Sequence, residues 1–200
     1  MQLTQTVFVD GFDERILKSE WEWANPAGDS SYTLSSEAGW LEVQAARGSS
    51  LSRPQFDAPR LLQTISGDFA VEVKIKAASE DVPSVGGLLI WKDEAHFIRL
   101  ERGLHGKDEI GFLGNTGDEP HYFGRGMLAS DVLTLRLERT GDRVTAHCSD
   151  DGTNWFTCGT VRIPVGDPIQ VGIYAIGLVS TGGDWRAMTA TRFVDFRVMR

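Results

Sequence analysis

Apolar and polar residues alternate one by one along several segments of the chain, and this period of two limits the fold more than any other feature. In the segment 69–76, large apolar residues occupy every second position. The segments 133–138 and 144–149 follow the same rule. Successive side chains of a strand point to opposite faces, so each segment predicts a strand with one buried and one solvated face.

Turn residues separate these segments. Thr140-Gly141-Asp142 and Asp151-Gly152 each lie between two alternating runs, as expected of hairpin turns. A sustained helical period is almost absent. We count about a dozen strands, which predicts an all-β fold, a two-sheet antiparallel β-sandwich or jelly roll. A length of 200 residues predicts that 1–200 forms a single domain.

The charge of the chain narrows the range of partners. The formal net charge is -8 and the pI is about 5.0, so a phosphate backbone would be repelled and no nucleic acid partner is expected. Apolar runs are too short to span a bilayer, and the first residues do not form a signal peptide. We therefore expect no membrane partner, and either a cytoplasmic protein or a domain excised from a larger one.

Cys148 and Cys158 are the two cysteines of the chain, and they flank a predicted hairpin turn. A cross-strand disulfide between them is geometrically conceivable. Without an export signal, two reduced thiols are the expectation.

The ordered series of motifs resembles a known family. The motifs are VDGFD at 9–13, Trp21 and Trp23, then 59–75, 86–103, SDDGTNW at 149–155 and RFVDFRV at 192–198. Together they resemble a regulation-of-enolase-like branch of the concanavalin A-like lectin/glucanase superfamily, and the C-terminal β-sandwich of some β-xylosidases. The resemblance covers essentially the whole chain and implies a concanavalin A-like sandwich. It leaves function open, because this superfamily contains lectins, carbohydrate-binding modules, glycosidases and proteins of unknown role.

Alternation within 86–101 predicts a binding face. The apolar positions of its two strands form the core side: Leu88, Ile90, Ile98 and Leu100. The outer side then carries Trp91, Phe97, Arg99 and Glu101, while other strands contribute Arg136, His147 and Tyr174. A sugar ring can stack on Trp91 while charged side chains bind its hydroxyls, so we expect a non-catalytic module that binds an oligosaccharide.

Two structural interpretations compete with this site. Charge ladders such as Glu72 with Arg136 can simply hold and solvate a sheet. Trp91 could lie under a loop, as part of a second small core. The alternative function is a protein–protein interaction or regulatory domain, and the third is a glycoside hydrolase. Glu72, Glu101 and Glu138 each have a basic neighbour on the same face, which works against a general acid.

Two further predictions concern a metal and a loop. Asp10, Asp13 and Asp195 lie on the first and last strands, which are adjacent in related sandwiches, so a structural calcium ion could bind there. No other cofactor is expected. The stretch 102–126 is rich in glycine and charge, and it predicts a loop, either an ordinary exposed connection or a rim over the polar face.

Overall fold

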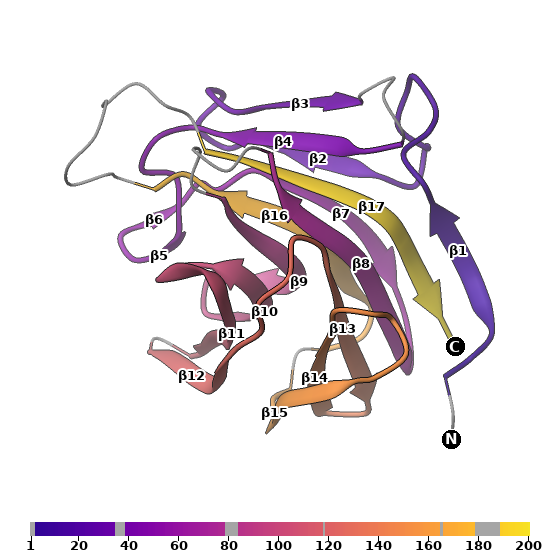
Figure 1. Ribbon diagram of the computed structural model, residues 1–200. Helices are drawn as coiled ribbons and strands as arrows, with labels where there is room; N and C mark the ends of the chain where they lie inside the picture. Colours follow the sequence, from indigo (N-terminus) through magenta and orange to yellow (C-terminus); the bar gives the residue numbers. More distant parts are fainter. Residues whose placement is uncertain (1–2, 35–38, 79–83, 118, 165, 179–188) are drawn as a thin grey trace.

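The computed structural model of the protein describes residues 3–34, 39–78, 84–117, 119–164, 166–178 and 189–200. Two large antiparallel β-sheets pack face to face in a sandwich (Figure 1), which confirms the predicted fold class. The described residues contain no helix long and apolar enough to cross a membrane.

Sheet A has eight strands within the described residues, in the order β15-β14-β13-β8-β17-β4-β3, with β1 also paired to β17. Their bounds are β15 Phe156–Arg162, β14 Arg143–Ser149, β13 Leu133–Thr140, β8 Phe69–Ala77, β17 Thr189–Met199, β4 Leu41–Ala45, β3 Ser31–Leu34 and β1 Thr6–Asp10.

Sheet B has seven described strands, in the order β12-β11-β10-β9-β16-β7-β2. Their bounds are β12 Pro120–Met127, β11 Gly106–Thr116, β10 His96–Gly103, β9 Val85–Asp93, β16 Ile169–Ile176, β7 Arg60–Ile65 and β2 Glu22–Ala24. A separate hairpin joins β5 (Leu51–Ser52) and β6 (Gln55–Phe56). Strands of two to four residues such as these carry too little alternation to be found in the sequence, so the described count of 17 exceeds the predicted dozen.

The main core lies between the two sheets and is built from the apolar positions that the alternation selected. Leu88 and Ile90 of β9, with Ile98 and Leu100 of β10, are fully buried in it, as predicted. From sheet A, Leu135 and Leu137 of β13 face them. The opposite side chains of β9 and β10 consequently lie on the outer face of sheet B, the face turned away from this core.

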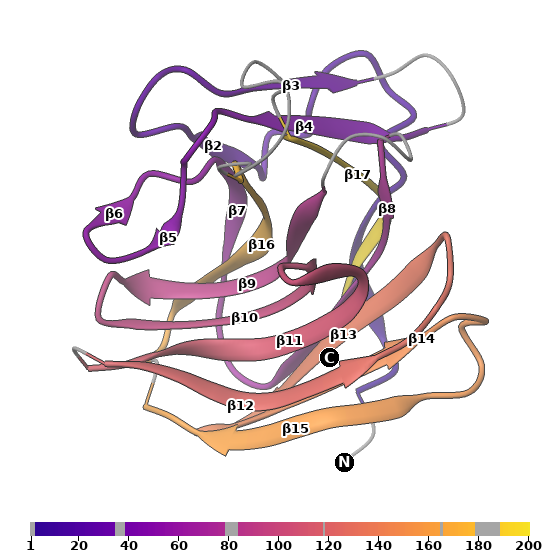
Figure 2. The same cartoon turned by 60° about the vertical axis from the view of Figure 1, so that its left-hand side comes forward.

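The prediction of a loop over 102–126 is wrong, because β11 and β12 lie there. Strand β12 is an edge of sheet B and passes close to β15, an edge of sheet A (Figure 2). A Cβ atom on Gly124 would lie only 1.8 Å from the Cys158 carbonyl oxygen. Glycine permits this approach of two backbones. Glycines within β11 and β12 also interrupt the alternation of apolar and polar residues by which the two strands could have been predicted.

The chain ends meet along β17, where β1 pairs with residues 196–199 (Figure 1). Asp10, the last residue of β1, is buried and fixes the turn that follows it. One carboxylate oxygen of Asp10 accepts a hydrogen bond from Trp21 Nε1 at 2.8 Å, and the other accepts one from the Phe12 backbone N–H at 2.9 Å. Trp21 in turn packs against Phe196 with ring centroids 4.7 Å apart.

Replacing this carboxylate is expected to destabilise the fold. Asp10→Ala leaves a buried indole N–H and a buried backbone N–H without acceptors, which costs about 1–3 kcal/mol each. Urea unfolding at neutral pH measures the change, and Asp13→Ala, at an exposed carboxylate of the same segment, is the matched control, expected within about 0.5 kcal/mol of wild type. Equal losses in both variants would contradict a specific role for Asp10.

Candidate functional site

The outer face of sheet B brings three of the predicted site residues together: Arg99, Glu101 and Tyr174. Arg99 and Glu101 lie on β10, two residues apart, so their side chains share this face. Glu101 is in register with Gly87 of β9, which is in register with Tyr174 of β16. A Cβ atom on Gly87 would lie 1.9 Å from the Leu100 carbonyl oxygen, so glycine permits the close approach of β9 and β10 here. Tyr174 reaches across β9 to the Glu101 carboxylate two strands away.

These three side chains form a buried polar chain. The Tyr174 hydroxyl donates a hydrogen bond to Glu101 Oε2, and Arg99 Nη1 lies 3.5 Å from the same oxygen. Glu101 and Tyr174 have no exposed surface, and Arg99 is 5% exposed. Glu101 therefore lies beneath the surface and holds the guanidinium of Arg99 above it.

Burial and neighbouring charges fix the protonation states of Arg99 and Tyr174. Burial opposes the charged form of Arg99 and is the largest single effect, but Glu101, Tyr174 and Tyr122 together outweigh it and raise the pKa of the guanidinium. Burial, together with the charge of Glu101, raises the pKa of Tyr174 well above its ordinary value. Arg99 thus stays a cation, and Tyr174 stays a neutral donor.

A pocket of about 480 Å³ opens above Arg99. Strands β11 and β12 supply Leu113 and Tyr122, which are in register with each other and with Arg99. The opposite wall comes from the segments 48–55 and 176–178, with Ser49 and Ser50 among its polar groups. No carboxylate is present among the described residues that line this pocket.

Arg99 enters the pocket with unsatisfied hydrogen-bonding capacity. Within the described residues, neither its Nε nor its Nη1 atom has a hydrogen-bond partner, although both are buried. A buried donor without an acceptor costs about 1–3 kcal/mol, so such an arrangement needs a reason. A ligand oxygen bound over the guanidinium is the kind of group that would satisfy it.

The expectation that Trp91 is an exposed platform is wrong. Trp91 is only 8% exposed and belongs to a second apolar cluster on the outer face of sheet B, together with Phe97 and Leu51. The β5–β6 hairpin lies over this cluster, beside the end of β9 (Figure 2). Arg60 covers one face of the indole, with its guanidinium carbon 4.4 Å from the ring centroid. The competing interpretation, a covered tryptophan in a second small core, is the one that the structure shows.

The sequence interpretation missed the pocket walls. Tyr122, which is 54% exposed and presents its ring at the pocket, lay in the stretch that was predicted as a loop. Ser49 and Ser50 lie in a short connection with no periodic pattern. One available signal was Gly87, since a glycine within a strand indicates a close approach of another group.

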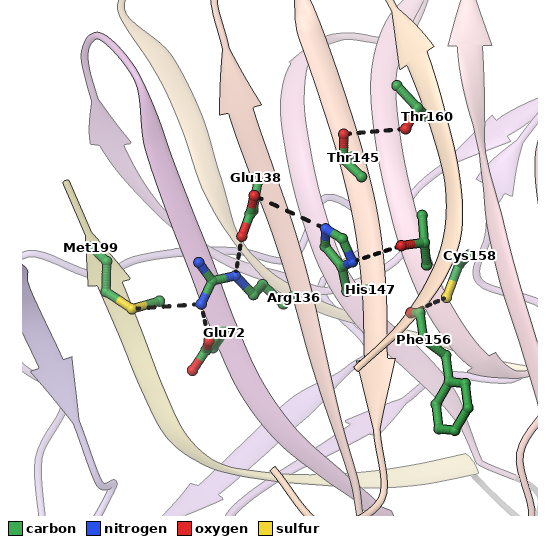
Figure 3. Close-up of polar contacts among 10 residues, drawn as sticks. Glu72, Arg136, Glu138, Thr145, His147, Phe156, Cys158, Thr160 and Met199 are labelled. Carbon is green, nitrogen blue, oxygen red and sulfur yellow. Dashed lines mark hydrogen bonds and ion pairs between the residues drawn. The ribbon is translucent and has the colours of Figure 1, made fainter. Parts of the chain in front are cut away.

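Arg136 and His147 lie on the other side of the sandwich, on the outer face of sheet A, so they do not share a site with Arg99. Arg136 binds Glu72 at 2.5 Å and Glu138 at 2.6 Å, and His147 approaches Glu138 at 4.0 Å (Figure 3). Such a cross-strand network of charges holds a sheet without any ligand. The charge-ladder interpretation describes this face well.

The three aspartates predicted to bind calcium do not converge. Asp10 turns inward to Trp21, whereas Asp195 turns outward and binds Lys74 at 2.7 Å. Asp13 is exposed. Among the described residues there is no group of three or more His, Cys, Asp or Glu side chains that could hold a metal ion. The terminal strands are adjacent, as expected, but they present these carboxylates to different partners.

Comparison with known proteins places the sequence in a family without an assigned activity. Residues 40–186 match the family described as Protein of unknown function (DUF1349). A search of curated proteins found no match.

Solved structures share the fold at low identity. The GH43 BlXynB protein from Bacillus licheniformis superposes with a TM-score of 0.78 at 17% identity, over 96% of this chain. The chain spans only 39% of that protein. A functionally unknown protein from Saccharomyces cerevisiae has a TM-score of 0.70 at 15% identity, over 90% of this chain and 96% of its own. LamAcat from Zobellia galactanivorans has a TM-score of 0.67 at 16% identity and covers 99% of this chain and 98% of its own.

Removing one hydroxyl tests the buried polar chain. Tyr174→Phe leaves Glu101 Oε2 without its hydroxyl donor, which is expected to lower the free energy of unfolding by about 1–3 kcal/mol. Denaturant unfolding measures this, and Tyr32→Phe, at a tyrosine that is 37% exposed, is the control. Little effect at Tyr174, comparable with the control, would argue against a buried carboxylate that depends on this bond.

The outer face of sheet A makes a separate prediction about pH. Burial lowers the pKa of His147, Glu138 opposes this and Arg136 reinforces it, so the folded pKa lies below the ordinary value. As pH falls through about 6.5, the unfolded chain binds a proton that folded His147 does not, and stability decreases. Denaturant unfolding across this range should show a smaller decrease for His147→Gln than for wild type. Identical pH profiles would contradict the assignment.

Proposed function

The chain belongs to the DUF1349 family, and we propose that it is a non-catalytic module that binds a carbohydrate in the pocket above Arg99. The observation that carries the proposal is the buried guanidinium at this pocket, whose Nε and Nη1 atoms have no hydrogen-bond partner within the described residues, although Nη1 lies in an ion pair with Glu101. Its position is fixed from below by Glu101 and Tyr174. A preorganised donor of this kind binds a ligand oxygen without first losing side-chain freedom.

The charge balance at the Arg99 guanidinium favours a neutral, hydroxyl-bearing ligand, and Arg53 adds a second cationic side chain to the pocket wall. The positive charge of Arg99 is already matched by Glu101, which lies directly against it. An anion would place a second negative charge beside the same guanidinium, whereas a sugar hydroxyl supplies an acceptor without added charge. Ser49 and Ser50 offer further hydroxyl groups for the other edge of the ring.

Tyr122 supplies the aromatic surface that was predicted for Trp91. It lies at the pocket wall, in the same row as Arg99, and more than half of its surface is exposed. The C–H face of a sugar ring packs well on such a ring, while its hydroxyls point toward polar groups at the edge. The carbohydrate hypothesis thus stands on a different aromatic residue from the one the sequence indicated.

The resemblance to a regulation-of-enolase-like domain implies instead a regulatory module with a protein partner. That function calls for a large exposed apolar patch on the outer sheet. On the outer face of sheet B, the large apolar side chains that could form such a patch, Trp91 and Phe97, lie under the β5–β6 hairpin. We therefore favour the sugar. A glycoside hydrolase receives no support from the described pocket lining, which holds no carboxylate pair.

Calorimetric titration with neutral oligosaccharides, beginning with xylo-oligosaccharides, tests the proposal. Tyr122→Ala is expected to weaken binding by about tenfold, which corresponds to about 1.4 kcal/mol and to the loss of one stacking contact. Phe156→Ala is the matched control, because Phe156 is equally exposed, at 53%, but lies outside this pocket.

The Arg99→Lys variant tests whether binding depends on the hydrogen-bond donors of the guanidinium or only on its positive charge. Lysine keeps the positive charge beside Glu101 but loses the planar fork of donors, so binding should be lost while the fold survives. Equal binding by wild type, Tyr122→Ala and Arg99→Lys would exclude this pocket. No heat of binding with any neutral oligosaccharide in the panel would refute a carbohydrate ligand.

A further inference from the structure

The two cysteines converge on one place at the open edge of the sandwich. Cys148 lies on β14 and points into the main core, and Cys158 lies on the neighbouring strand β15 and packs against that core. Strand pairing shifts its register between Ala146 and His147, so that Cys158 is the extra, bulged residue of β15. Both cysteines line the same small pocket.

Both thiols are free. The Cys158 thiol donates a hydrogen bond to the Phe156 carbonyl oxygen, with the sulfur 3.9 Å from that oxygen (Figure 3). Interaction with the Cys158 thiol lowers the pKa of Cys148, against the opposing effects of burial and of Asp150. Interaction with Cys148, together with burial, raises the pKa of Cys158.

A small pocket leads to both sulfur atoms. Its volume is about 180 Å³, and both cysteines line it together with Met127 and Phe156, which are largely exposed at its mouth. A water molecule takes about 30 Å³ in the liquid, so the pocket admits hydrogen peroxide. It is smaller than the roughly 300–1,000 Å³ of pockets that hold drug-sized ligands, which disfavours bulky oxidants such as glutathione disulfide.

We propose that Cys148 and Cys158 form a dithiol modification site, at which a small hydroperoxide converts the two thiols into a reversible disulfide. The site rests on the placement of the two cysteines on paired strands and on the pocket that both of them line. It is independent of the proposed carbohydrate site, because neither cysteine lines the pocket above Arg99.

The chemistry balances in two steps. The Cys148 sulfur, as its thiolate, attacks one peroxide oxygen, the O–O bond breaks, and the leaving hydroxide takes a proton to become water, which gives a sulfenic acid. The Cys158 sulfur then attacks the Cys148 sulfur, the S–O bond breaks, and the departing oxygen leaves as a second water with the Cys158 proton. Two thiols lose two electrons, and one hydrogen peroxide gains them.

Bond formation needs a small movement, because the sulfur atoms must approach to about 2 Å. The Cys158 backbone is packed closely against Gly124 of β12, so rotation of the Cys158 side chain has to supply this movement. Cys148 is anchored in the core, so the movement falls mainly on Cys158.

Intact-mass analysis of the folded, reduced full chain after brief treatment with hydrogen peroxide tests the site. The expected product has lost two hydrogen atoms, offers no thiol to iodoacetamide after denaturation, and regains both thiols with dithiothreitol. Oxidation of exposed Met127 would instead add one oxygen, so the mass separates the two reactions.

Cys158→Ala is the informative variant, because its side chain is only partly buried and the core cysteine stays in place. In this variant Cys148 should gain oxygen and should not reach the product that has lost two hydrogens. The same peroxide treatment of urea-unfolded wild type should form the disulfide more slowly than the folded protein does.

Three results would overturn the proposal. One is retention of both thiols in the folded wild type after peroxide treatment. Another is addition of oxygen to cysteine in the wild type to the same extent as in Cys158→Ala. The third is disulfide formation that is as fast in the unfolded chain as in the folded protein.

Discussion

Sheet B is covered on both faces, and this double burial controls what its side chains can do. One face contributes Leu88 and Ile90 to the main core, and the other carries Trp91 under the β5–β6 hairpin. A polar residue on the second face is therefore removed from water and must find its partners within the sheet. Glu101 finds them in Tyr174 and Arg99, and only the guanidinium reaches the pocket.

Alternation predicted the sheets and the side on which each residue of β9 and β10 lies, because a period of two is a local property of the chain. It could not predict whether the outer side is open. That depends on the β5–β6 hairpin, whose strands of two residues leave no pattern. Trp91 was thus placed on the correct face and given the wrong exposure.

The candidate site was predictable in part for the same reason. Arg99, Glu101 and Tyr174 share a face by alternation, and the structure places all three there. Tyr122 was missed because glycines interrupt β12. Arg136 and His147 were grouped with Arg99 although they lie on the other sheet, since residue spacing within single strands says nothing about which sheet a strand joins.

The approach of β12 to β15 also affects how readily molecules of this protein aggregate. Each is an edge strand of its sheet, and an exposed edge strand offers unpaired backbone groups to a strand of another molecule. Here Gly124 and Gly159 let the two backbones come so close that each strand shields the other. The sandwich is nearly closed on this side, like a barrel with a narrow seam, and aggregation by strand addition is hindered there. A bulky residue at Gly124 would open the seam, so its first effect would be on solubility.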